Sequence, residues 1–131
     1  MPEYDIDITL ACETEATECG SGARKACDSK ETVIEAPEGH VIDDRTFDVE
    51  MLVERGSENT APYAFDNYIS ILEHAPELKY PTTVRMHVHA RSSEGRCAGG
   101  GKTEARFFGN YINYERYTDM FKDCVIPTEN S

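Results

Sequence analysis

The chain has 131 residues and a mass of 14.7 kDa, the size of one domain with one hydrophobic core. Its 13 Lys and Arg against 25 Asp and Glu give a formal net charge of −12 and an isoelectric point near 4.6. This balance argues against nucleic-acid phosphates and anionic membrane surfaces as partners, because both attract basic proteins. No apolar run approaches the roughly 20 residues that span a bilayer, so we expect no membrane insertion.

The share of large apolar side chains is low. Leu, Ile, Val and Phe number 24 of 131 residues, which together with a high net charge is typical of disordered chains. The apolar residues nevertheless alternate with polar ones, and seven Tyr and four Met add further core-forming side chains. We therefore expect a folded domain with a thin core that is supported by covalent crosslinks or by neighbouring molecules.

Two-residue alternation of apolar and polar side chains predicts half-buried strands. The first predicted strand covers 4–12, and a polar, glycine-containing loop over 14–25 follows it. The second covers 26–36, which contains a run of β-branched residues. The third covers 46–54, where alternate residues from Phe47 onward are apolar.

The second half of the chain continues the pattern. The segment 64–72 fits both helical and strand spacing, and its mediocre helix formers favour a strand. The clearest alternation lies over 82–91, and the last long predicted strand covers 103–114. Helical spacing of aromatic and Met residues predicts a short helix in the tail, 115–131.

Together these elements predict one all-β domain over residues 1–131. Six to seven strands without helices between them are typical of an antiparallel β-sandwich, Ig-like or similar, here with a short C-terminal helical turn. Because sandwiches carry many unrelated functions, the predicted fold does not decide what the protein does.

The chain contains five cysteines: Cys12, Cys19, Cys27, Cys97 and Cys124. If the runs around Cys12 and Cys27 pair as a hairpin, these two cysteines face each other. Cys97 lies in a loop that Cys124 could reach. If these two pair, Cys19 is left without a disulfide partner. Disulfides in an oxidising compartment suit a small domain with a weak core, whereas the alternative is five reduced, buried thiols. A zinc site is disfavoured because the sequence has no Cys-x-x-Cys pair.

The expected compartment depends on whether Met1 is the native start of the protein. The residues from Met1 to Asp5 are acidic and lack the apolar centre of a secretory signal, which favours a cytoplasmic protein if Met1 is the native start. A mature secreted domain preceded by an added Met would have the same sequence. In that case the cysteines favour an extracellular location.

The pattern Arg85-x-His87-x-His89-x-Arg91 is the most informative one for a site. On a strand, residues two apart share a face, which places both imidazoles about 7 Å apart on one side. Such a pair can supply two ligands to a divalent metal, although the flanking arginines add like charge.

A solvated strand face without a metal is favoured over a metal site. A solvated strand face would let its cationic residues pair across the sheet with Asp48 and Glu50. A metal would need a third ligand, for which His40, His74, Asp48 or Glu50 are the candidates. No cofactor is predicted, and a divalent metal is kept as the alternative.

Two further patterns are interpreted as structural. The run from Gly99 to Thr103 departs from the phosphate-binding loop because position 96 is Arg96 and no helix follows, so we expect a flexible hairpin connection. Asp43, Asp44 and Asp48 could form a calcium site, but they lack EF-hand spacing and favour a solvated acidic surface.

No nucleophile elbow or recognisable catalytic cysteine occurs, so the sequence predicts a non-catalytic binding or assembly module. Its expected partner is a protein or a second copy of the chain. Residues that combine contact area with hydrogen-bonding capacity are the candidates for ligand binding: Arg85, Arg91, Tyr111 and Tyr114. The alternatives are a small metal-binding protein or metalloenzyme that uses His87 and His89, and a secreted, disulfide-stabilised toxin or effector.

Overall fold

The computed structural model describes residues 3–56 and 59–121. Over these residues the chain forms eight strands and one short helix. In chain order they are β1 (Ile6–Glu13), β2 (Ala26–Asp28), β3 (Thr32–Glu35), β4 (His40–Arg55), β5 (Ala64–Ser70), β6 (Lys79–Met86), β7 (His89–Arg91), β8 (Lys102–Asn113) and α1 (Tyr114–Phe121).

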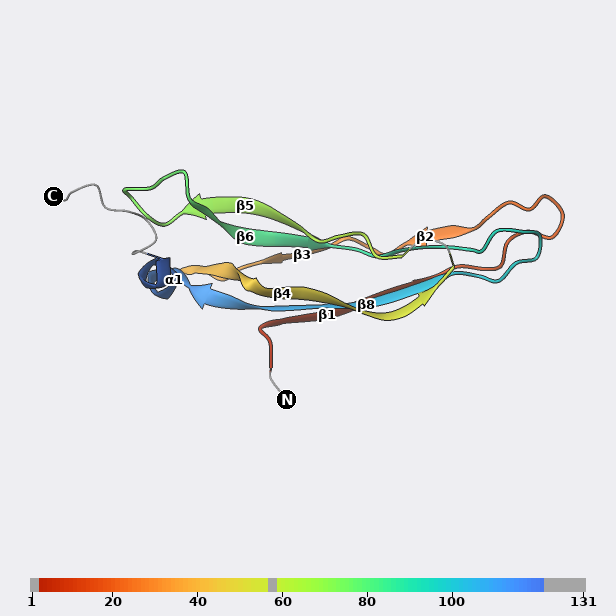
Figure 1. Cartoon of the computed structure of the whole chain (residues 1–131), viewed down its shortest axis with the longest axis horizontal. Helices are drawn as coiled ribbons and strands as arrows, with labels where there is room; N and C mark the ends of the chain where they lie inside the picture. The colour runs from red at the N-terminus through yellow and green to blue at the C-terminus, as the bar shows by residue number, and fades with distance from the viewer. Residues whose placement is uncertain (1–2, 57–58, 122–131) are drawn as a thin grey trace.

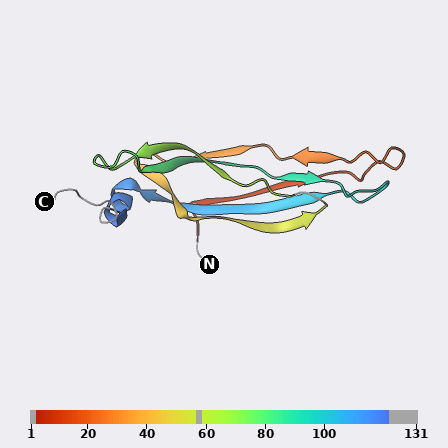
Figure 2. The same ribbon diagram turned by 45° about the horizontal axis from the view of Figure 1, so that its top comes forward.

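The strands form three antiparallel sheets. Two have three strands, in the orders β1-β8-β4 and β3-β6-β5, and the third pairs β2 with β7. The molecule is long and thin, with β1-β8-β4 in one layer and the other two sheets end to end in the second layer (Figures 1 and 2). The prediction of a mostly β, antiparallel protein is confirmed. The finer prediction of a six- to seven-stranded Ig-like sandwich is not confirmed, because the strands form three sheets and several strands are short.

Two of the predicted strands are each divided in two. The predicted strand 26–36 becomes β2 and β3, and 82–91 becomes β6 and β7. At the break, the Val88 N–H donates to the hydroxyl of Ser29 at 2.9 Å instead of to a backbone carbonyl. A polar side chain therefore replaces one bond of the ladder and interrupts both strands at the same level.

The core lies between the layers and is built from the alternating faces that the sequence predicts on 82–91 and 103–114. The side chains of Val84, Met86, Val88 and Ala90 are fully buried from one layer, and Phe107 is fully buried from the other. At about 25 cal/mol per Å² of apolar surface removed from water, this burial is the main favourable contribution to folding. The segment that fits both helix and strand is the strand β5, which pairs with β6 and packs Phe65 against this core.

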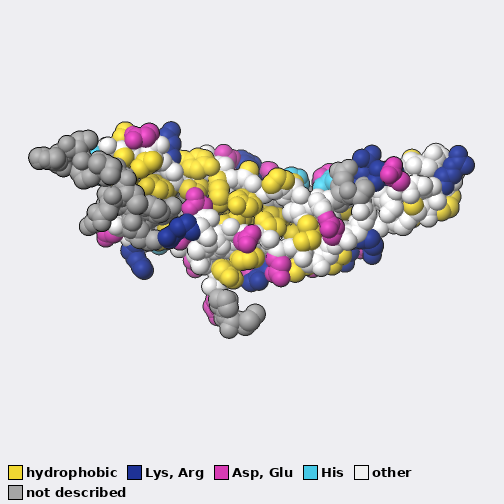
Figure 3. Space-filling model, in the orientation of Figure 1, with side chains coloured by type: hydrophobic (Ala, Val, Ile, Leu, Met, Phe, Trp, Pro, Cys, Tyr) yellow, Lys and Arg dark blue, Asp and Glu magenta, His cyan; other side chains and the backbone are white. Residues whose placement is uncertain are grey.

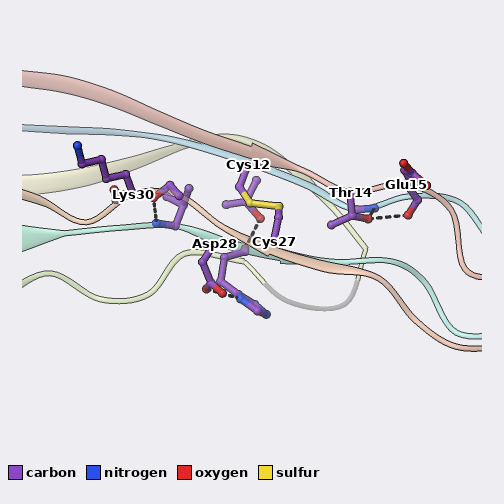
Figure 4. Close-up of a disulfide and its surroundings, with 11 residues drawn as sticks. Cys12, Thr14, Glu15, Cys27, Asp28 and Lys30 are labelled. Atoms are coloured by element: carbon purple, nitrogen blue, oxygen red, sulfur yellow. Dashed lines mark hydrogen bonds and ion pairs between the residues drawn. A yellow bond between two sulfur atoms is a disulfide. The ribbon is translucent and has the colours of Figure 1, made fainter.

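One disulfide joins the two layers. Cys12 of β1 is bonded to Cys27 of β2, with 6.0 Å between their Cα atoms, and Figure 4 shows the bond crossing between the two strands. The sequence predicts that these two cysteines face each other, but the hairpin from which this prediction follows is wrong. The strands β1 and β2 form no hairpin, since β1 pairs with β8 and β2 pairs with β7.

The second disulfide differs from the expected pairing. Cys97 is bonded to Cys19, not to Cys124, and Cys19 is therefore not left over. Cys124 lies outside the described residues. The bond closes a sequence separation of 78 residues and links the loops 14–25 and 92–101, which pack side by side at one end of the molecule (Figure 1).

These two loops form an ordered tip rather than a flexible connection between hairpin strands. The strands β7 and β8 on either side of the glycine run belong to different sheets, so no hairpin exists there. The buried hydroxyl of Thr17 donates to Ser92 Oγ at 2.7 Å. A Cβ at Gly101 would collide with the Arg91 carbonyl oxygen, whereas a Cβ at Gly99 would meet nothing within 4 Å. Close backbone approach therefore requires glycine at 101.

We predict that replacing Gly101 destabilises the protein and that replacing Gly99 does not. Gly101→Ala should lower the free energy of unfolding by about 1–3 kcal/mol because the backbone of Arg91 must move. The matched control Gly99→Ala should stay within about 0.5 kcal/mol of wild type. Denaturant unfolding measures both values, and equal effects of the two variants would contradict the close approach.

We predict that the oxidised protein yields two crosslinked peptide pairs, Cys12–Cys27 and Cys19–Cys97. Trypsin combined with a glutamyl endopeptidase separates all four cysteines, and mass spectrometry without reductant identifies the links. A Cys19–Cys27 or Cys97–Cys124 link would show that the pairing is wrong. Replacing Cys12 and Cys27 together by Ala should lower the free energy of unfolding by about 2–4 kcal/mol.

Candidate functional site

The outer face of the β3-β6-β5 sheet carries Arg85, one of the candidate binding residues. Its guanidinium forms ion pairs with Asp66 of β5 and with Glu31, the latter at 2.9 Å. The prediction that Arg85 pairs with Asp48 and Glu50 is wrong, because both lie on β4 in the other layer. There Glu50 Oε1 is 3.6 Å from Arg106 Nη1. Alternation identified the face of Arg85 but not the strands beside it.

The Arg85 guanidinium holds the pKa of the Asp66 carboxyl below its ordinary value of 3.8, mainly by hydrogen bonding. Because this folded-state pKa is depressed, the stability that the pair contributes is present above the unfolded-state pKa. It is lost as the pH falls through the lower, folded-state value. Both side chains are more than 40% exposed, so water and salt screen the interaction.

The two histidines of the His-x-His pattern are not joined by a third ligand among the described residues. His87 lies between β6 and β7, and His89 Nδ1 is 2.7 Å from Asp28 Oδ1 in the directly opposed position of β2. Within residues 3–56 and 59–121, no group of three or more His, Cys, Asp or Glu side chains is placed to hold a metal ion.

The other candidate residues are dispersed. Arg91 is exposed at the end of β7, where its backbone carbonyl faces Gly101. Tyr111 lines a groove of about 730 Å³ beside the first residues of β4. Tyr114 opens α1 and lines a different groove, of about 660 Å³, with Ile69 and Ile71. The structure therefore does not combine these residues into one site.

An apolar surface that the sequence analysis did not single out runs along one long side of the molecule. There β4 and β5 lie at the same side, as shown by the contact between the rings of Phe47 of β4 and Phe65 of β5, whose centroids are 5.6 Å apart. Hydrophobic side chains gather over β5 and toward β4 in Figure 3. We call this surface the seam, and its partly exposed side chains are Val49, Met51, Tyr63, Phe65 and Ile69.

The seam is held in shape by aromatic contacts. The ring of the buried Phe47 lies 4.7 Å from that of Tyr63 and 5.6 Å from that of Phe65, both edge-on. Such contacts stabilise each pair by about 0.5–1.5 kcal/mol beyond area burial. Beyond this cluster Met51 stays 39% exposed and Ile69 37% exposed. The alternation in 46–54 predicted an inward face for Met51 but could not show how far the other layer covers it.

The strand edges beside the seam are irregular. In β5, Asn67 has a positive φ of 56°, which is uncommon for a residue other than glycine. In β4 the register with β8 shifts between Asp43 and Asp48 and again between Met51 and Val53. Bulges and irregular residues of this kind hinder the addition of a further strand. The seam is therefore suited to contacts through side chains rather than through backbone pairing.

Comparison of the chain with protein-family models, curated proteins and solved structures found no match. The one helix that the structure describes is too short to cross a lipid bilayer.

We predict that Arg85→Gln raises the pKa of Asp66 toward 3.8, because the hydrogen bond that favours the carboxylate is removed. A pH titration followed by carboxyl-detected NMR measures this change. Asp7 is the internal control, since Arg106 and not Arg85 lowers its pKa. An unchanged Asp66 titration, or an equal change at Asp7, would contradict the pairing.

Proposed function

We propose that the protein is a non-catalytic binding module whose contact surface is the seam. The observation that carries this proposal is the exposure of Met51 and Ile69 in a chain that has few large apolar residues for its core. Exposed apolar patches bordered by polar residues mark sites of protein interaction. In this view, the two layers form a small sandwich that presents the seam.

The charge of the protein specifies the partner further. The chain carries a net charge of −12, and Glu115 and Asp119 border the groove at the Ile69 end of the seam. A partner surface with apolar side chains flanked by Lys or Arg would bury the seam and gain electrostatic attraction. A second acidic copy of this chain is less favoured, because like charges oppose its approach.

The two disulfides support a location in an oxidising compartment, since cytosolic thiols are kept reduced. A secreted binding module and a secreted effector share this requirement and differ only in what the seam contacts. The metal alternative is tested separately by elemental analysis of the purified protein. A stoichiometric transition metal that is lost in His89→Ala would favour a metalloprotein instead.

We predict that two charges on the seam weaken binding. Met51→Glu combined with Ile69→Glu should weaken capture of a basic partner at least tenfold, because two carboxylates would be desolvated in the contact. Val33→Glu is the matched control, since Val33 is 46% exposed but lies on β3 at the opposite edge of its sheet. Capture is compared by quantitative mass spectrometry with wild type and both variants as bait.

The proposal requires a protein that is retained by wild type and by Val33→Glu but is lost with the double variant. Analytical ultracentrifugation tests self-association on the same three proteins. If every captured protein and the oligomeric state are the same for all three, the seam is not the contact surface. Circular dichroism and denaturant unfolding show whether the double variant keeps the fold.

A further inference from the structure

A polar groove lies away from the seam, where β4 departs from regular pairing with β8. Asp43 pairs with Asn110 and Asp48 with Phe108, so residues 44–47 oppose Gly109 alone. Bulges often re-aim side chains beside functional sites. Gly109 permits this one, because a Cβ there would lie 2.9 Å from the Cα of Phe47.

The bulge builds the wall of a groove of about 730 Å³. The groove is lined by β4, β8, α1 and the segments before β1 and β4. Its polar lining comprises Asp5, His40, Asp43, Arg45, Asn110, Tyr111, Asn113 and Arg116. A volume of this size suits an organic ligand rather than a single inorganic ion.

Both acidic groups of the groove are engaged within the protein. Asp43 is 5% exposed, and its carboxylate accepts hydrogen bonds from Arg45 Nε at 2.8 Å and Arg45 Nη2 at 2.7 Å. Asp5 accepts one from the Tyr111 N–H at 3.0 Å, and its own N–H donates to Asn110 Oδ1 at 3.1 Å. These contacts fix the walls and occupy the Asp43 carboxylate, whereas the Asp5 carboxylate accepts one of these bonds and keeps further acceptor positions.

Other polar groups of the groove have no partner within the part of the chain that the structure describes. They are the Tyr111 hydroxyl, the Asn110 amide nitrogen and the Arg116 guanidinium. His40 Nδ1 lies 3.0 Å from the Glu38 carbonyl, which can only accept, so Nδ1 carries the proton and Nε2 is an acceptor in the neutral ring. Burial, with a smaller effect of Asp5, raises the pKa of Tyr111, so its hydroxyl stays a donor at neutral pH.

We infer that this groove binds a sugar that carries one carboxylate, of the uronic-acid class. Arg116 would hold the carboxylate, for which a guanidinium offers two parallel donors. Asn110, Tyr111 and His40 provide the mixed donors and acceptors that sugar hydroxyls require, and the Tyr111 ring offers an apolar surface for the sugar ring.

The test uses three probes: acetate carries the carboxylate alone, glucose the sugar ring alone, and glucuronate both. Each is titrated to about 10 mM and followed by NMR of the isotopically labelled protein. Glucuronate should shift the amides of Asn110, Tyr111 and Arg116 and bind at least fivefold more tightly than the other two. Equal binding of acetate would identify a site for free carboxylates and overturn the sugar. Equal binding of glucose would overturn the role of Arg116, and absence of shifts with all three would overturn the site.

Two variants assign the roles. Arg116→Gln should weaken glucuronate binding about tenfold and leave any weak glucose binding unchanged, whereas Tyr111→Phe should weaken both sugars because only the hydroxyl is removed. Arg96→Gln, an exposed arginine in the loop 92–101 at the opposite end, is the matched control and should bind as wild type does. An Arg116→Gln protein with wild-type glucuronate affinity would contradict the inference. Seam variants should not alter sugar binding, which separates this site from the proposed protein contact.

Discussion

The covalent bond between Cys12 and Cys27 is the constraint on which the arrangement of the two layers depends. Each layer is at most three strands wide, and the apolar share of the chain is small, so burial alone gives a narrow margin of stability. The bond joins β1 of one layer to β2 of the other at the edge of the hydrophobic core. It limits the freedom of the unfolded chain and keeps the layers in contact where few large side chains remain to do so.

The two long sides of the molecule are closed in different ways. On one side β1 lies against β2 and β7 and is crosslinked to the second layer. On the other side the rings of Phe47, Tyr63 and Phe65 fill the space between β4 and β5, and the apolar side chains beyond them stay exposed. In the proposed function, the crosslinked side stabilises the fold, and the exposed seam on the other side is the surface that contacts a partner.

Periodicity predicted which side chains face inward but not which sheet each strand joins. The alternation from Val84 to Ala90 was sufficient to place four core residues correctly. The same pattern could not show that Arg85 pairs with Asp66, because the partner strand is decided by chain topology. For the same reason Cys97 was assigned to the wrong partner: the approach of Cys19 depends on two long loops that pack at the tip. The β4 bulge beside the polar groove is permitted by Gly109 in the neighbouring strand, so the sequence of β4 alone does not predict it.

Hydrogen exchange before and after reduction tests most directly whether the layers depend on the crosslinks. In the oxidised protein, the amides of β8, which is central in its sheet, should exchange most slowly, and those of β1 and β2 should also be protected. Reduction of both disulfides, and removal of the Cys12–Cys27 bond alone in the Cys12→Ala/Cys27→Ala variant, should each accelerate exchange throughout β1 and β2 more than in β8. Identical protection of β1 and β2 in both states would contradict the account, because the layers would then be held together without the bond.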